Sequence, residues 1–337
     1  MKTKIKESLG LSFISLLTAM SVSSCSETEI VAFPEGEPQP GKEITLNISA
    51  PADASTRATS DHKLRFTAKL FKGKYGSDPK DNFIEKKQAI ASEGKGTIVF
   101  SVPQGDYSVL LFADYIPNST QADSEGLYED AYYDTSSKDE EIRMIAFTTN
   151  TSSHDLIQKH CINNDNYDCF SAYTGVINKT ESVYEENFVL ERAVSKVRVV
   201  SNTPPPSPVT EIKFTRFYCF DIFKQYYNTV FCEKTYENMR LSSHTISGMS
   251  NPDINEIFYF YTLAANNTEN LGEISCDIKF QDGETKTLTI PTGTIKVKRK
   301  YITTVKGNIL SEPIPETGDI ILHLTSDDTW LEQEFKI

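Results

Sequence analysis

Few side chains in this sequence are spaced for catalysis. The chain has five scattered histidines: His62, His154, His160, His244 and His323. Two of them, His154 and His160, are too far apart to form a metal pair on neighbouring turns of a helix. The chain has no H-E-x-x-H, no G-x-S-x-G and no glycine-rich phosphate loop. The oxygen-rich stretches 163–168 and 138–141 lack the spacing of calcium loops. The sequence therefore predicts a non-enzyme with no metal and no cofactor.

The cysteines are the residues best suited to covalent chemistry. Five of the six follow residue 150: Cys161, Cys169, Cys219, Cys232 and Cys276. An odd number cannot all pair within the chain, and none has the C-x-x-C spacing of a zinc site. Cys161 and Cys169 flank a short loop, and Cys219 and Cys232 flank a turn, so each pair is a candidate disulfide in an oxidising compartment. The alternative is a set of buried, reduced thiols.

The sixth cysteine, Cys25, follows a segment of a different kind. Lysines at the start precede an uncharged apolar run, 9–22, which is shorter than the roughly 20 residues of a membrane-spanning helix. This layout is typical of a secretory signal peptide. Residues 21–24, SVSS, resemble a bacterial lipobox, which implies that residues 1–24 are removed and that Cys25 carries the lipid of the precursor. The alternative is a plain signal peptide and an incidental cysteine.

Composition limits the class of protein and its partners. The 337 residues leave room for two domains. The formal net charge of −13 disfavours nucleic acid as a partner, because the chain repels phosphate backbones. Phe and Tyr number 19 and 16, and helical periodicity is scarce, so the chain is expected to be mainly all-β, with long loops and minor helix.

The amino-terminal half predicts a tether followed by strands. Residues 25–42 are acidic and rich in Pro and Gly, as a tether is. In residues 43–49, EITLNIS, the apolar side chains of Ile44, Leu46 and Ile48 alternate with polar ones, which predicts a half-buried strand. A flexible exposed loop that contains Arg57 follows.

Further strands are expected beyond that loop. Residues 63–73 alternate with one apolar face. Two apolar runs flank a turn at 103–106, and the second, 107–112, suits a central strand covered on both faces. A long tyrosine-rich loop is expected over 117–137 and a short helix near 152–160.

The second half predicts another set of strands, beginning at 191–202. The proline-rich run 203–208 is interpreted as a loop after the first of these strands, so the domains are placed at 43–190 and 191–337. An Asp-Gly sequence within DGE suggests a hairpin. A two-residue turn would split the apolar residues between two faces, so a three-residue loop or a bulge is predicted. Its partners are expected to be Ile278 with Leu288 and Cys276 with Ile290.

These features converge on a family. The lipobox, the Thr-Arg-Ala loop, GDYSVLLFADY, DAYYDT, DCFSAYTG, LERAVSKVRVV and VKRKYITTVKGNILS occur in that order. Together they resemble the fimbrillin-like (FimA/Mfa-type) surface lipoproteins of Bacteroidetes, over most of the chain. The resemblance implies two tandem transthyretin-like β-sandwich domains and a structural or adhesive pilus subunit.

The resemblance also implies an assembly mechanism. An arginine-specific protease would cut between Arg57 and Ala58 and release the strand that carries Ile44, Leu46 and Ile48. A strand from another subunit would then fill the groove by β-strand addition. The alternative is an ordinary strand beside a surface arginine that is never cleaved.

The expected location is the cell surface, as an outer-membrane lipoprotein or within a fimbrium. The expected partners are other pilus subunits, the outer membrane through the lipid, and glycans or proteins on host or bacterial surfaces. The second hypothesis is a non-polymerising glycan-binding outer-membrane lipoprotein, in which Tyr128, Tyr132 and Tyr133 would stack on sugars.

Overall fold

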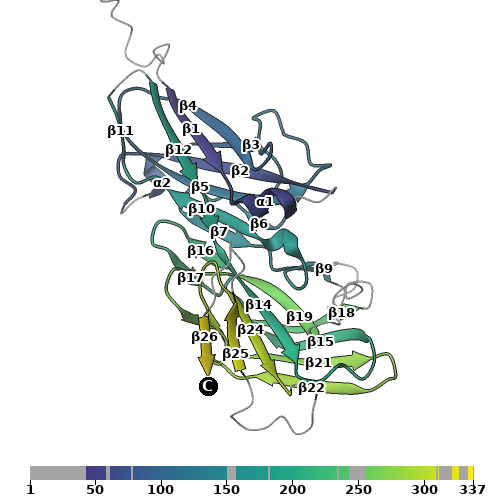
Figure 1. Cartoon of the computed structure of the whole chain (residues 1–337). Coiled ribbons are helices and arrows are strands. Elements are labelled where there is room, and N and C mark those ends of the chain that lie inside the picture. The colour runs from purple at the N-terminus through teal and green to yellow at the C-terminus, as the bar shows by residue number, and fades with distance from the viewer. Residues whose placement is uncertain are drawn as a thin grey trace, which may run out of the picture. The chain divides into compact units, whose positions relative to one another are not determined.

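A computed structural model of the protein (Figure 1) describes residues 43–57, 61–76, 79–149, 157–180, 183–233, 235–242, 255–308, 310, 321–325 and 333–336. Nearly all of its regular structure is strand, so the predicted all-β class is confirmed. The helices are α1 (Ala52–Arg57), α2 (Pro79–Asn82) and the 3-10 turn η1 (Asp165–Tyr167). Within the described residues, no helix has the length and apolar character needed to cross a membrane.

The first β-sandwich packs a small sheet against a larger one. The small sheet has the order β12 (Val183–Val189), β1 (Glu43–Ser49), β4 (Lys95–Ser101). The larger has the order β13 (Glu191–Arg192), β10 (Cys169–Tyr173), β5 (Gly105–Pro117), β2 (His62–Lys72), β3 (Phe83–Ile90), and β11 (Ile177–Lys179) also pairs with β5. The predicted turn at 103–106 carries the chain from one sheet to the other.

The core of this sandwich follows from period-2 alternation. Side chains from β1, β2, β4 and β5 form one buried cluster, in which Phe66, Phe100 and Ala113 have no exposed surface. The central position predicted for 107–112 is confirmed, because β5 pairs with β2 on one side and with β10 and β11 on the other.

The outer face of the larger sheet is buried as well, which the alternation in β2 did not predict. Arg65 donates from Nε and Nη2 to Asp114 at 2.9 and 2.8 Å, and its Nη1 lies 2.8 Å from Oδ1 of Asp130. Lys69 donates to the carbonyls of Asp139 and Glu141 at 3.1 and 3.2 Å. The chain after β5 thus covers this face: it supplies Asp130 to Arg65 and the carbonyls of Asp139 and Glu141 to Lys69.

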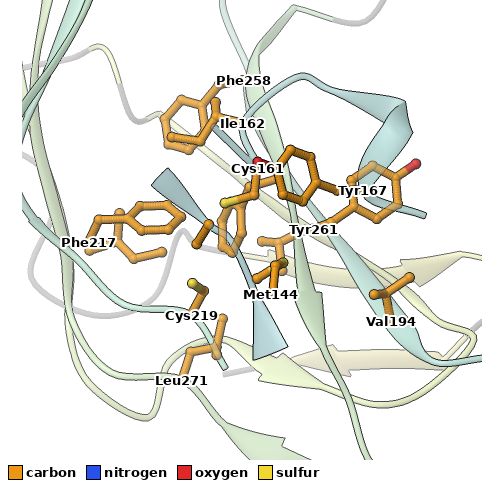
Figure 2. Packing of buried hydrophobic residues seen from close by; sticks show 14 of the residues in the cluster. Met144, Cys161, Ile162, Tyr167, Val194, Phe217, Cys219, Phe258, Tyr261 and Leu271 are labelled. Atoms are coloured by element: carbon orange, nitrogen blue, oxygen red, sulfur yellow. The ribbon is translucent and has the colours of Figure 1, made fainter. Parts of the chain in front are cut away.

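The second β-sandwich also has two sheets. One has the order β19 (Glu256–Leu263), β14 (Val194–Ser201), β24 (Ile302–Gly307), β25 (Ile321–Thr325), β26 (Gln333–Lys336). The other has the order β18 (Tyr236–Ser242), β15 (Val209–Phe217), β21 (Ile274–Phe280), β22 (Thr285–Ile290). Aromatic side chains join them: the rings of Phe214 and Phe258 meet edge to face with centroids 5.5 Å apart. Figure 2 shows part of this core.

A further sheet has the order β17 (Thr229–Phe231), β16 (Ile222–Lys224), β7 (Glu141–Met144), β6 (Tyr133–Asp134). Two pairs are smaller: β20 (Glu269–Asn270) with β23 (Lys296–Val297), and β8 (Phe147–Thr149) with β9 (Ile157–His160). β7 and β16 come from either side of Glu191, so strands of both predicted domains share a sheet; the domain boundary itself stays a prediction.

The helix expected near 152–160 is wrong for 157–160, which form β9, and its earlier residues lie outside the described chain.

The hairpin between β21 and β22 has the predicted three-residue loop but a different register. Cys276 lies opposite Leu288, and Ile274 opposite Ile290. The predicted partners were therefore wrong by two residues. Phe280 extends β21 and its N–H donates to the Glu284 carbonyl at 2.9 Å, while Gly283 takes the left-handed conformation with φ 91°. A glycine is favoured there because a side chain would clash with the backbone.

Burial of Lys69 makes stability pH-dependent. Burial lowers the pKa of its ammonium group from 10.5 to about 8. Between these values the unfolded chain holds the proton and the folded chain does not, so stability rises with pH through this window. We expect the free energy of unfolding of the wild type to rise by up to about 3 kcal/mol relative to Lys69→Met between pH 8 and 10.5. Urea unfolding measures this, and a constant difference between the two proteins would contradict it.

Candidate functional site

The first strand is enclosed by the sheet that it completes. β1 pairs with β4 in antiparallel register and with β12 in parallel register along its whole length. Ile44 and Leu46 are fully buried and Ile48 is 2% exposed. The prediction that these three side chains share one buried face is confirmed. β1 is therefore a central strand that contributes both main-chain bonds and core contacts.

Polar contacts on the opposite face of β1 also reach both neighbours. Asn47 donates from Nδ2 to Glu185 at 2.7 Å and accepts from the Thr97 hydroxyl at 3.0 Å. The Ser49 carbonyl accepts from the Leu190 N–H at 2.8 Å, just beyond the end of β12. Only the buried face supplies apolar contacts, so the position of β1 is set by register and by the hydrophobic core.

The core contact of β1 depends on a close approach at Gly96. This residue lies opposite Ile48 in β4. A Cβ at position 96 would be 2.8 Å from Cδ2 of Phe66, whose side chain is fully buried in the facing sheet. Glycine is required here because the Phe66 ring occupies the space that a side chain would need.

The segment after β1 is fastened to the core at α1. Ala54 is fully buried, and its carbonyl accepts from the Tyr115 hydroxyl at 2.7 Å. Asp53 forms an ion pair with Arg192 of β13. Arg192 also holds Asp168, at 2.9 Å from Nε to Oδ1 and 2.7 Å from Nη2 to Oδ2. The end of α1 nearest β1 is thus held by one hydrogen bond and one largely buried ion pair.

The Arg192 guanidinium stays charged in this setting. Its burial alone would lower its pKa, but the carboxylates of Asp168 and Asp53 outweigh that effect and raise it. Asp168 has no exposed side-chain surface, whereas Asp53 is 21% exposed. Asp53 is therefore the partner that contacts solvent. The sequence analysis did not predict this group of ion pairs. A signal was present, because Arg192 alternates in step with Leu190 and Val194 and so falls on an apolar face, which is unusual for a charge without a partner.

The predicted site residues fall in different parts of the structure. Arg57 is the last residue of α1, while Ala58 and Cys25 lie outside the described residues. The predicted disulfides, Cys161 with Cys169 and Cys219 with Cys232, are not formed among the described cysteines.

The tyrosines considered for sugar stacking are mostly in the core. Tyr132 is 7% exposed and Tyr133 is fully buried. The Tyr133 hydroxyl donates to the Tyr167 carbonyl at 2.5 Å, and Tyr132 lies 2.7 Å from a ring nitrogen of His62. Tyr128 is half-buried. Among the described residues, no cluster of three or more His, Cys, Asp or Glu side chains is arranged to hold a metal ion.

The described chain is thus an all-β protein of two sandwiches, the first completed by its first strand. Residues 38–334 match the model of a family of unknown function, DUF6562, and the chain belongs to that family. Comparison with curated proteins gives no match.

Three solved structures are similar to the chain. The tip fimbrial protein Mfa3 of Porphyromonas gingivalis, with a C-terminal truncation, shares 13% identity over 84% of this chain and 98% of its own, with a TM-score of 0.44. A candidate adhesin of Bacteroides ovatus shares 15% over 85% and 91%, with a TM-score of 0.39. A candidate polysaccharide-binding protein of Bacteroides thetaiotaomicron shares 10% over 88% and 98%, with a TM-score of 0.43. Two of these three proteins are described as fimbrial or adhesin proteins, the kind that the sequence resemblance predicted, and the third as polysaccharide-binding.

The close approach at Gly96 gives a direct test of the packing around β1. Gly96→Ala is expected to destabilise the protein by about 1–3 kcal/mol, because the new methyl group displaces the Phe66 ring. The control is Gly76→Ala, whose added Cβ would meet only the Lys74 carbonyl at an ordinary 3.7 Å. Its effect should stay below about 0.5 kcal/mol. Equal effects of the two variants in urea unfolding would refute the role assigned to Gly96.

Proposed function

We propose that this protein is a structural or adhesive subunit of a cell-surface fibre and that it assembles by strand exchange. In this proposal, cleavage between Arg57 and Ala58 frees residues 43–57, and a strand of another subunit takes the place of β1. The observation that carries it is the central position of β1, whose covalent link to β2 passes through the bond after Arg57.

Loss of β1 would leave a groove whose unpaired edges and empty pockets favour the binding of another strand. β4 and β12 would each lose a hydrogen-bonded neighbour, and unpaired main-chain groups in a covered position are costly. The pockets of Ile44, Leu46 and Ile48 would also be empty. A seven-residue strand spans about 23 Å, so the groove suits a strand with apolar residues at alternate positions.

The groove edges do not by themselves choose the direction of an incoming strand. β4 is antiparallel to β1 and β12 is parallel to it, so the two edges run in opposite directions. Any strand between them is parallel to one edge and antiparallel to the other. The direction of an incoming strand must therefore be set by its side chains. The buried, charged Arg192 lies at one end of the groove and favours a segment that carries a carboxylate at that end.

Delivery to the surface is the role proposed for the segment before β1. A lipid on Cys25 would hold the precursor at the outer membrane. Cleavage after Arg57 would then separate the chain from that anchor. α1 has only six residues, and helices of this length gain little stability by themselves. The contacts of Asp53 and Ala54, more than the helix itself, are therefore what a protease must loosen to reach the bond after Arg57.

Glycan binding by a non-polymerising lipoprotein remains the second candidate. The burial of Tyr132 and Tyr133 removes two of the three tyrosines first considered for stacking on sugars and leaves only the half-buried Tyr128. No other described feature favours this candidate over strand exchange, so the assembly test below distinguishes the two.

Cleavage after Arg57 is expected to convert the monomer into a strand acceptor. Treatment with an arginine-specific protease should give a chain that begins at Ala58, binds a fluorescent peptide of residues 43–57 and forms SDS-resistant multimers. Mass spectrometry, fluorescence anisotropy and unheated SDS gels measure the three outcomes. The variant Arg57→Gln should remain uncut there and monomeric.

A matched peptide tests whether uptake depends on the apolar pockets. The peptide with Leu46→Asp places a charge in a fully buried position and should bind at least roughly 100-fold more weakly. A cleaved chain that stays monomeric and binds neither peptide would refute strand exchange for this protein.

The ion pair at α1 is expected to slow release of the first strand. Asp53→Asn removes the charge that faces Arg192, and hydrogen bonds to charged groups contribute about 1.5–3 kcal/mol. After cleavage, residues 43–57 should leave the variant roughly 10–100-fold faster than the wild type. Release of labelled peptide, followed by size-exclusion chromatography, measures the rate.

Glu43→Gln is the matched control for this measurement, because Glu43 is an exposed carboxylate at the other end of the same segment. It should change the rate less than about twofold. Equal rates for Asp53→Asn and the wild type would show that Arg192 does not hold the segment.

A further inference from the structure

A hollow lies at one end of the second sandwich, where four strands of one sheet begin or end. Tyr218 follows β15, Thr235 precedes β18, Glu273 precedes β21 and Thr292 follows β22. These strand ends are neighbours, because β15 pairs in antiparallel register with β18 and β21, and β21 pairs in the same way with β22. The hollow has a volume of about 330 Å³, within the roughly 300–1,000 Å³ of small-molecule sites.

The loops around the hollow are held by main-chain hydrogen bonds. β20 carries Asn270, which lines the hollow, and pairs with β23. The Leu271 N–H donates to the Ile295 carbonyl, and the Gly293 N–H donates to the Leu271 carbonyl, both at 2.9 Å. The backbone next to Asn270 and Thr292 is therefore fixed, as the backbone of a binding site must be.

The aromatic wall of the hollow is the half-buried ring of Tyr218. A Cβ at position 272 would lie 2.6 Å from Cγ and 3.0 Å from Cε2 of this ring, so Gly272 is required for the ring to take its place. The ring of Phe220 also meets it at 82°, with centroids 5.7 Å apart. Packing thus positions the Tyr218 ring before any ligand binds, which lowers the entropy lost on binding.

The polar wall is a guanidinium group between two carboxylates. Arg216 lies opposite Glu237 across β15 and β18, with 3.8 Å from Nη2 to Oε1. Its Nη1 lies 3.5 Å from Oε1 of Glu273. The three side chains are between 34% and 57% exposed, and ion pairs this exposed contribute only about 0–1 kcal/mol. A ligand can therefore share these groups at small cost.

These two walls match the two kinds of surface on a sugar ring. An aromatic ring packs against the apolar C–H face of a sugar. Each sugar hydroxyl is both a donor and an acceptor, so neighbouring hydroxyls can accept from Arg216 and donate to Glu237 or Glu273. The exposed amide of Asn270 adds a further donor and acceptor to the lining.

We propose that the hollow at Tyr218 is a carbohydrate-binding site for neutral sugars. Two carboxylates surround a single guanidinium group, so the lining disfavours acidic sugars through charge repulsion. A peptide strand is not the expected occupant, because strand addition needs an open strand edge and this hollow is built from strand ends.

The site supplies a ligand class for the adhesive role proposed above, and the proposal rests on that role. It does not depend on strand exchange, because none of the lining residues belongs to β1 or to its neighbours. The site is compatible with a fibre subunit and with a non-polymerising lipoprotein alike. Loss of sugar binding would leave the multimers expected after cleavage unchanged, so the two proposals fail separately.

Isothermal titration calorimetry of the uncleaved full chain tests the proposal. The probes are three neutral hexasaccharides, cellohexaose, mannohexaose and xylohexaose, and one acidic hexasaccharide, hexagalacturonic acid. At least one neutral probe should bind with a Kd below about 1 mM, and the acidic probe should bind at least roughly tenfold more weakly. Saturable binding by none of the neutral probes, or tighter binding by the acidic one, would overturn the proposal.

Matched variants assign the binding to the hollow. Tyr218→Ala removes the aromatic wall and should weaken binding at least roughly tenfold. The control is Tyr227→Ala, which removes a tyrosine that is 55% exposed and lies outside the hollow, and its Kd should change less than about twofold.

A second variant keeps the test decisive if Tyr218→Ala fails to fold. Asn270→Ala changes an exposed side chain of the lining and should weaken binding at least about threefold. An affinity that neither Tyr218→Ala nor Asn270→Ala reduces, or that Tyr227→Ala reduces equally, would show that sugars do not bind in this hollow.

Discussion

The first sandwich depends on the main-chain hydrogen bonds of one strand, β1, which lies between two strands that do not neighbour each other in sequence. β1 separates β4 from β12 and pairs with both, although these strands are far apart in sequence. A sheet with its central strand removed is left with two unpaired edges and a slot in the core. No local rearrangement of β4 and β12 restores both the hydrogen bonds and the packing at once, so the position of β1 needs an occupant.

The rest of the site is arranged around that constraint. Alternate apolar side chains of β1 fill the core, and Gly96 leaves room for the Phe66 ring against it. The Arg192 ion pairs hold α1, which lies between the strand and the bond after Arg57. In the strand exchange that we propose, retention and replacement of the strand would depend on different contacts. The apolar pockets would determine which sequences fit, and the charged end would determine how firmly and in which direction a segment is held.

The sequence predicted the features that local periodicity encodes. The strand at 43–49 and its buried face follow from strict alternation, and the central position of 107–112 follows from a run that is apolar on both faces. Long-range pairing was not predictable in the same way. Cys161 and Cys169 are close in sequence and both are fully buried, yet they are not bonded to each other.

Buried charges were missed for a related reason. Arg65 and Lys69 alternate with apolar residues in β2, which is the pattern of a solvent-facing side, but the segment after β5 covers them. A single strand carries no information on what packs over it. The register predicted for the hairpin was wrong for a narrower reason. The rule that apolar residues share one face was correct, but the three-residue loop was placed at 282–284 and lies at 281–283.

The most direct test of the account is the amino terminus of the protein recovered from the cell surface, determined separately for monomers and for SDS-resistant multimers. Strand exchange predicts that chains in multimers begin at Ala58 and that chains which still carry residues 43–57 are monomeric. Multimers whose chains retain the first strand, or chains beginning at Ala58 that are found only as monomers, would contradict it.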